Sequence, residues 1–135
     1  MAVFVLKDAS VTVNSVDLSS YVTSITLDYK FDAVETTAMG SGGHTFTGGL
    51  QNNQVQINFN QDFAATKVAA TLDALAGTTT TIIVKPTSGA VSATNPSYTI
   101  STAYCEGTQP VAGSVGDLAA MSWTATGGTL VKATS

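Results

Sequence analysis

Two stretches of alternating apolar and polar residues, separated by a polar segment, limit the fold of this chain more than any other feature. The apolar residues occupy every second position in residues 22–31 and again in residues 54–59: Ile25, Leu27, Tyr29, Phe31, Val55, Ile57 and Phe59. A period of two is typical of a β-strand with one buried face. Residues 35–53, between the two stretches, are polar and rich in glycine. They form a connection far longer than the roughly two to five residues of a hairpin. The sequence therefore predicts two strands joined by a long loop that contacts other molecules.

After residue 59 the spacing of apolar residues changes to three and four. This spacing predicts an amphipathic helix over residues 62–76, capped by Gln61 or Asp62 and followed by Gly77. The other alternating segments predict short strands in residues 11–14, 78–85, 97–105, 119–126 and 129–132. Their connections are too short for parallel crossovers, so antiparallel pairing is expected.

The expected fold is mainly β: a β-sandwich or barrel of about seven to eight antiparallel strands with one flanking α-helix. The length suits a single domain over residues 1–135, with residues 1–7 as a possible N-terminal pairing arm. Trp123 alternates with Met121 and Ala125, so we expect its side chain to be buried in the core. The pair Gly127-Gly128 predicts a hairpin turn of the primed kind.

The chain carries few charges, and this narrows the classes of partner. Charged residues make up 10% of the sequence, against roughly 25% in ordinary soluble domains. The net charge is -4, and all five basic residues are lysines. Without the planar fork of arginine, tight binding of DNA or RNA is disfavoured, although DNA could slide past such a surface. Low charge also protects weakly against self-association, which fits a subunit covered by copies of itself.

A single cysteine, Cys105, excludes an internal disulfide, and its apolar neighbours favour a packed residue over a reactive thiol. The first residues lack the pattern of a signal peptide, and no apolar run approaches the length of a membrane span. We expect a soluble protein made in the cytoplasm, with no membrane partner.

The sequence offers little material for catalysis. His44 is the only histidine and lies in the glycine-rich segment, so a loop or contact role is favoured over a general base. One histidine and one cysteine cannot build a zinc site, and residues 40–43 lack the lysine and helix of a phosphate-binding loop. We therefore expect no catalytic, metal or cofactor site and no enzymatic activity. Asp28, Lys30 and Asp32 are expected to continue one polar strand face, which is either simply solvated or part of a channel lining.

Several short segments occur in an order and spacing that resemble the tail tube (major tail) proteins of long-tailed bacteriophages. They are residues 11–22, 34–40, 48–50, 57–59, 62–63, 72–77, 84–86, 95–98 and 113–118. The resemblance covers nearly the whole chain. Ser15 departs from it, because many relatives have glycine at this turn.

The resemblance implies a β-sandwich-like fold whose copies form rings, commonly hexamers, that stack into a hollow tube for DNA in the virion tail. The partners would be further copies of the chain, other tail proteins such as the tape measure and terminator, and DNA that passes without specific binding. The long loop would then contact neighbouring subunits or rings through Glu35, Thr36, Thr37, Met39, Gly40, His44, Phe46, Gly48, Gly49 and Leu50. The candidates for the lumen are Asp28, Lys30 and Asp32, and those for an N-terminal pairing arm are Val3, Phe4, Val5 and Leu6.

Two alternatives stay open on the sequence alone. The first is a single-ring tail-terminator or connector protein, or the tube protein of a contractile secretion system. The second is a carbohydrate-binding β-sandwich, which would expose aromatic side chains such as Trp123. For the tube protein, we expect residues 35–53 to be mobile in the free subunit and ordered in the assembly.

Overall fold

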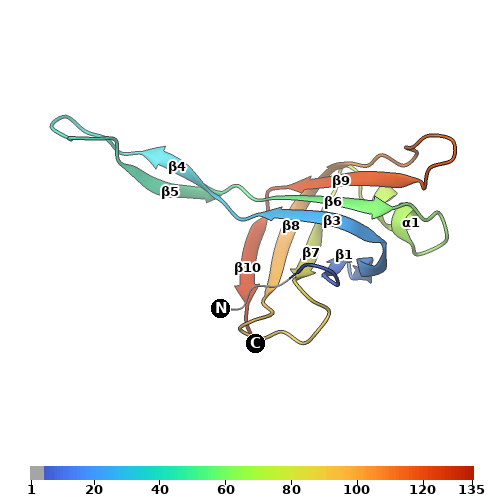
Figure 1. The fold of residues 1–135 in the computed structure, drawn as a ribbon. Helices are drawn as coiled ribbons and strands as arrows, with labels where there is room; N and C mark the ends of the chain where they lie inside the picture. Colours follow the sequence, from blue (N-terminus) through green and yellow to red (C-terminus); the bar gives the residue numbers. More distant parts are fainter. Residues whose placement is uncertain (1–4) are drawn as a thin grey trace.

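The computed structural model describes residues 5–135, and within them the backbone forms ten strands, one 3-10 turn and one short α-helix (Figure 1). The strands are β1 (Ser10–Val13), β2 (Val16–Asp17), β3 (Val22–Asp28), β4 (Phe31–Glu35), β5 (Phe46–Gln51), β6 (Gln54–Asn60), β7 (Thr79–Lys85), β8 (Ser97–Gly107), β9 (Ala120–Thr126) and β10 (Thr129–Ala133). The turn is η1 (Ser19–Tyr21) and the helix is α1 (Val68–Asp73). The strands pair antiparallel, so the predicted mainly β fold is confirmed.

Eight of these strands form one curled sheet that makes the body of the molecule, and β4 and β5 form a separate pair (Figure 1). Neighbouring strands follow the order β2-β1-β7-β8-β9-β6-β3, and β10 pairs with β8. In the part of the chain that the structure describes, the end strands β2 and β3 do not pair with each other. The sheet therefore curves around its core without closing into a barrel, which was one of the two expected forms.

The core follows the alternation of the sequence. The register of β6 and β9 places Ile57 opposite Trp123 and Phe59 opposite Met121. All four side chains are buried, and Trp123 is fully enclosed, as expected. Burying a large apolar side chain contributes roughly 1.5–3 kcal/mol. A sugar-binding surface built on Trp123 is therefore excluded, and Cys105 is buried as expected.

The expected helix over residues 62–76 is wrong in its length, because α1 covers only Val68–Asp73. Asp62 does not cap it: its carboxylate accepts a hydrogen bond from the Ala64 N–H at 2.9 Å, which closes a local turn instead. Thr66 then adopts a positive φ of 61°, a conformation that interrupts a right-handed helix. Phe63, assigned to the apolar face, is consequently exposed.

The expected single strand over residues 22–31 is also wrong, because it divides into β3 and β4, which belong to different sheets. The chain leaves the body at Tyr29 and Lys30. Tyr29 and Phe31, which the alternation assigns to the buried face, are both about half exposed, and their ring centroids lie 5.5 Å apart. The alternation correctly predicts extended backbone in residues 22–31. Beyond the end of β3, however, no core formed by the described residues lies against the apolar side chains of Tyr29 and Phe31.

Two predicted turns are formed. Gly127 and Gly128 have φ values of +78° and +80° and join β9 to β10, as a primed hairpin turn requires. Asn14 and Ser15 join β1 to β2 with φ values of 51° and 66°. Ser15 therefore occupies a left-handed position where glycine would be the easier residue.

Candidate assembly surface

The most distinctive surface is a hairpin that extends away from the body, which we call the arm, residues 31–51 (Figure 1). Its strands β4 and β5 pair with each other, with Glu35 opposite Phe46 and Val34 opposite Thr47. The expected loop over residues 35–53 is thus only partly correct, because residues 46–51 form a strand and the true loop is residues 36–45. Nearly every residue of the arm is exposed. An exposed hairpin without a core of its own needs a partner to bury its side chains.

The tip of the arm is organised by hydrogen bonds between its two sides. The Thr36 N–H donates to the Thr45 carbonyl at 2.8 Å, and the Thr45 N–H donates to the Thr37 hydroxyl oxygen at 2.9 Å. Glu35 accepts the Thr37 hydroxyl at 3.0 Å and lies 2.6 Å from Nδ1 of His44. These contacts bring Glu35, Thr36, Thr37 and His44 together at the tip of the arm.

His44 lies in solvent at the tip of the arm, where its side chain is accessible to a partner. Its side chain is 79% exposed and that of Glu35 is 51% exposed, so water screens the pair. A catalytic role would need a nucleophile and a sheltered pocket beside the imidazole. The arm instead offers a solvated loop tip.

Glycine has a structural reason at two positions of the arm, Gly49 and Gly40. A Cβ atom on Gly49 would lie 2.9 Å from Cγ2 of Val34 and 3.2 Å from the carbonyl oxygen of Asp32. A side chain at this position would push β4 and β5 apart. Gly48 lies opposite Ala33 and has free space around it, and Gly40 takes a φ of +92° at the tip.

Large apolar side chains project from the arm into solvent. They are Phe31, Val34, Met39, Phe46 and Leu50, with Leu50 81% exposed and Met39 fully exposed. Contiguous exposed apolar side chains of this kind mark interaction surfaces in soluble proteins. Of the ten predicted loop-contact residues, Met39, Phe46 and Leu50 offer the largest apolar area to a partner.

The root of the arm is fixed to the body by one buried side chain, Asn53, which is 1% exposed. Its Oδ1 accepts the Lys30 N–H at 3.3 Å, and its Nδ2 donates to Gln51 Oε1 at 2.8 Å and to the Gly128 carbonyl at 3.2 Å. Gln51 Oε1 also accepts the Leu130 N–H at 2.8 Å. Asn53 thus joins both sides of the arm to the turn between β9 and β10. Sequence reasoning missed it because a single asparagine next to a strand carries no pattern.

The candidate lumen residues do not share one strand. Asp28 ends β3 in the body, Lys30 lies in the connection, and Asp32 belongs to β4 of the arm. The expected continuous row on a single strand is therefore wrong, because the chain changes sheets between Asp28 and Asp32. Whether these residues face a lumen stays a prediction.

The strand register reveals a polar face that no single strand shows. On the side of β3, β6 and β9 opposite the core, neighbouring residues form three rows. The rows are Ser24, Asn58 and Ser122; Thr26, Gln56 and Thr124; and Asp28, Gln54 and Thr126. Eight of these nine side chains are uncharged amides or hydroxyls. This surface, the polar face, presents hydrogen-bonding groups with a single carboxylate, Asp28.

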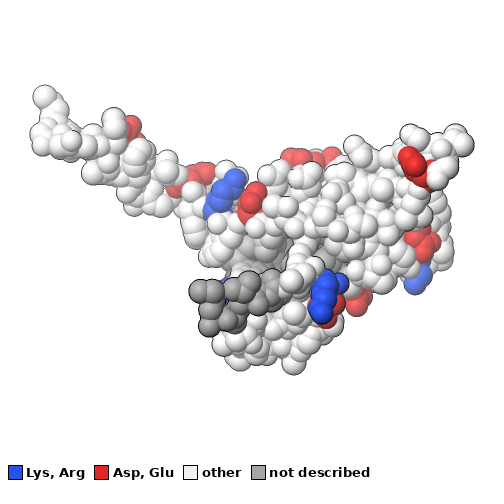
Figure 2. Space-filling view, viewed as in Figure 1, with Lys and Arg blue, Asp and Glu red and all other residues white. Residues whose placement is uncertain are grey.

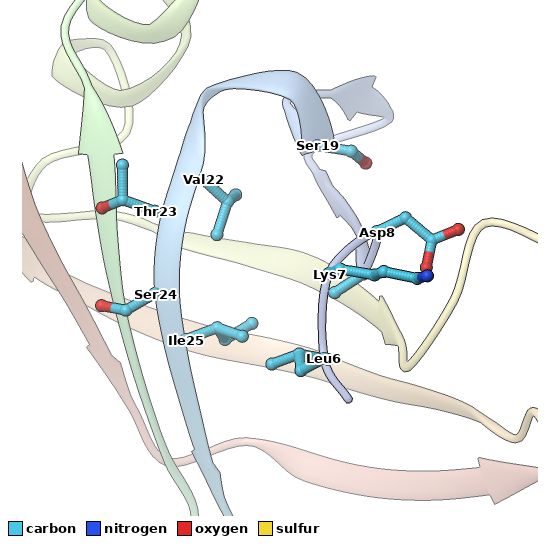
Figure 3. Close-up of a pocket in the computed structure, with 9 residues that line it drawn as sticks. Leu6, Lys7, Asp8, Ser19, Val22, Thr23, Ser24 and Ile25 are labelled. Atoms are coloured by element: carbon cyan, nitrogen blue, oxygen red, sulfur yellow. The ribbon is translucent and has the colours of Figure 1, made fainter. Parts of the chain in front are cut away.

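The N-terminal segment runs beside the free edge of β3 (Figure 3). Leu6 and Ile25 point toward each other there, and both line a cavity of about 100 Å³ and a neighbouring one of about 380 Å³. Val5 and Leu6 are exposed and lie outside any strand, while Val3 and Phe4 of the predicted pairing arm lie outside the described residues. In residues 5–135, β3 pairs only with β6, and the segment that contains Leu6 lies beside its other edge without forming a strand pair.

Three further properties of the described residues concern metal binding, thiol reactivity and membrane insertion. Residues 5–135 contain no cluster of three or more histidine, cysteine or acidic side chains that could hold a metal ion. Burial raises the pKa of the Cys105 thiol, which keeps it protonated and unreactive near neutral pH. Across the same residues, no helix has the length and apolar character needed to cross a membrane.

The curled antiparallel sheet, the short helix and the projecting hairpin form a fold that this chain shares with chains of tube- and tail-containing particles. The chain aligns over 98% of its length with 97% of a chain in the cryo-EM structure of an extracellular contractile injection system, the PVC sheath/tube terminator in its extended state. The identity is 13% and the TM-score 0.72. The expected tail tube resemblance is therefore confirmed at the level of the fold.

Two further structures support the same fold. The cap that terminates the tube of the anti-feeding prophage aligns over all of this chain and 95% of its own, with 14% identity and a TM-score of 0.68. A chain in the virion of a native gene transfer agent aligns over 93% of this chain and 95% of its own, with 15% identity and a TM-score of 0.59. In sequence, no protein family model and no curated protein matches the chain.

Proposed function

We propose that this chain is a structural subunit of a phage-like tail and acts as a single tail-tube-like domain. Copies assemble into rings, hexameric in our proposal, and the rings stack into a hollow tube in the virion tail. DNA passes through the lumen without specific binding, and the chain is made in the host cytoplasm. The observation that carries the proposal is the arm, because it exposes large apolar side chains beyond the body of the subunit. The likeness in fold to chains from tube terminators and tail particles supports it.

The described surfaces can serve three different contacts in such an assembly. The arm supplies contacts between rings. The unpaired edge of β3 and the segment that begins with Val5 and Leu6 supply strand pairing between neighbours in one ring. The polar face, with Lys30 and Asp32 near it at the start of the arm, lines the lumen. Its uncharged side chains offer few cations to hold phosphates, in line with transport without binding.

Electron microscopy of the purified chain over a range of concentrations, together with its mass in solution, tests this proposal. We expect rings or hollow tubes of uniform diameter. A variant in which Asn-Gly replaces residues 36–45 keeps β4 and β5 but shortens the arm, and it should form single rings or smaller species. Tubes of unchanged length from the shortened variant would refute the role of the arm. A monomer at every concentration would refute self-assembly.

A second candidate is a protein that forms one ring and ends a tube, because one neighbour in fold comes from a sheath/tube terminator. Such a subunit would form rings that do not stack at any concentration. Adding those rings to growing tubes of the cognate tail would then stop their elongation. Stacking of the isolated chain would exclude this candidate.

A further inference from the structure

Most of the large exposed apolar side chains of the described residues lie at two places on the molecule, while Val5, Leu6, Tyr104 and Val131 lie elsewhere. The first group lies on the arm and at its root: Tyr29, Phe31, Val34, Met39, Phe46 and Leu50. The second group, which we call the distal cap, lies in residues 61–67 and 108–119: Phe63, Val111, Val115 and Leu118. Figure 1 places the arm at one end of the molecule, and α1 with the loops around it at the other.

The two segments of the distal cap are joined into one surface. The Gln61 N–H donates to the Ala119 carbonyl at 3.0 Å, and Gln61 Nε2 donates to the Pro110 carbonyl at 2.9 Å. The Thr108 hydroxyl donates to the carboxylate of Asp73, the last residue of α1, at 3.0 Å. The apolar side chains of the distal cap are therefore held on a common support.

We infer that the distal cap is the surface on which the arm of a second copy docks. This inference rests on the proposed function and identifies the partner of the arm. A stack that grows by repeating one contact requires two different complementary patches, and repetition along one axis places them at opposite ends of the subunit. The arm and the distal cap meet both conditions. The arm also has the right size, because its roughly twenty residues match one side of a stable protein interface.

Opposite charges do not attract the arm to the distal cap, because both surfaces are acidic on balance. The arm carries Asp32 and Glu35 and no lysine, and the distal segments carry Asp62 and Asp117 with one lysine, Lys67. Figure 2 shows acidic side chains on the arm and at the opposite end of the body. Two surfaces of like sign associate through apolar contact, with the carboxylates at the rim. Docking on the polar face would instead set the apolar side chains of the arm against amide and hydroxyl groups.

Cysteine cross-linking between two variants tests the contact directly. Met39→Cys, at the arm tip, is mixed with Val115→Cys, in the distal cap, and the mixture is oxidised at concentrations where wild type assembles. The control mixture pairs Met39→Cys with Val131→Cys, because Val131 is 60% exposed on β10 but lies outside the distal cap. Wild type gives the background from the buried Cys105. Docking predicts that the heterodimer forms roughly tenfold faster in the first mixture than in the control, because binding raises the effective concentration. Equal rates would overturn the inference.

Serine variants, tested by assembly without cross-linking, distinguish failure of this inference from failure of the proposed function. Val115 and Leu118 are exposed, so Val115→Ser with Leu118→Ser should leave the far-ultraviolet circular dichroism and the unfolding midpoint unchanged. We expect rings without stacks from this variant, and full stacks from the control Val131→Ser. Normal tubes from the Val115/Leu118 variant would overturn docking on the distal cap and leave the tube function standing. Absence of any assembly by wild type, together with equal cross-linking rates, would overturn both.

Discussion

Gly128 is the glycine whose replacement by a residue with a side chain would cause the closest contact with the backbone. Its φ of +80° is strained for any other residue, and an added Cβ would lie 2.4 Å from the carbonyl oxygen of Ser101. Gly127 has nearly the same φ, +78°, but open space around it. We expect Gly127→Ala to lower the free energy of unfolding by about 1–2 kcal/mol, the cost of left-handed backbone. Gly128→Ala should lose about 1–3 kcal/mol more through the clash. Urea unfolding measures both, and equal losses would refute the role of the contact.

Asp17 is a residue whose ionisation affects the stability of the fold. Hydrogen bonds from the Ser19 hydroxyl and the Ser19 N–H lower the pKa of the Asp17 carboxyl below its ordinary value. A lowered pKa in the folded state stabilises the fold at pH values above the unfolded pKa, near 3.8, and this contribution is lost as the pH falls through the folded value. Asp17→Asn should therefore lower the urea midpoint at pH 7, and its difference from wild type should shrink as the pH falls below 3.8. A difference that persists unchanged at acid pH would refute ionisation as its cause.

At the residue scale, the sequence predicts the core well and the local turns less well. Period-two alternation is enough to predict that Ile57 and Trp123 are buried in the core, because successive residues of a strand point to opposite faces of the sheet. Phe63 looked equally apolar, yet it is exposed. The hydrogen bond from the Ala64 N–H to Asp62 competes with the first turn of the expected helix, and spacing alone does not reveal that competition.

At the element scale, Asn53 determines how the arm leaves the body. We expect Asn53→Ala to lower the free energy of unfolding by about 1–3 kcal/mol, since it leaves buried polar groups without partners. It should also weaken assembly, because the root of the arm loses its link to Gly128 and Gln51. Asn52→Ala is the matched control: its side chain is exposed, and its N–H keeps the bond to the Lys30 carbonyl at 2.7 Å. Equal effects of the two variants on unfolding and on assembly would contradict this role of Asn53.

Hydrogen exchange tests how ordered the arm is in the free subunit. The ladder between β4 and β5 has solvent on both faces, whereas the ladder between β6 and β9 covers the core. We expect the amides of the arm to exchange much faster than those around Ile57 in the free subunit, and to become protected on assembly. The same protection of the arm in both states would show that assembly does not order it.

The composition of the arm explains why the sequence predicts a loop where the structure has a hairpin. Its strand β5 contains Gly48 and Gly49, and glycine is depleted in strands. Gly49 belongs to the hairpin because it lies close to Val34 across the ladder, a relation that depends on register and not on composition. A register is set by pairing between two strands, so one segment read alone does not contain it.

At the scale of the whole molecule, salt distinguishes apolar docking from ionic docking. The chain has a net charge of -4, and its arm and distal cap are both acidic on balance. Raising the ionic strength from about 0.05 M to 0.5 M shortens the screening length and weakens this repulsion. We expect assembly, measured by light scattering and by tube length, to increase with salt. Dissociation at high salt would indicate that ion pairs hold the copies together.

The separation of apolar surface into two opposite ends is a property of the folded molecule. Met39 and Val115 are exposed, and nothing in the sequence relates one of them to the other. Their significance comes from the three-dimensional arrangement, in which one end of the molecule complements the other. The polar face has the same origin, because Gln56 becomes part of a row only when the register sets it beside Thr26 and Thr124.

The buried link at Asn53 makes the arm a spacer of fixed length. An arm joined by a loose hinge would tolerate insertions without changing the distance between copies, but this root ties the arm to the same turn that closes β9 and β10. Two residues inserted in each strand of the arm would lengthen it by about 7 Å, since a strand rises about 3.3 Å per residue. The axial repeat of a stack would then be set within each subunit, by the length of one hairpin.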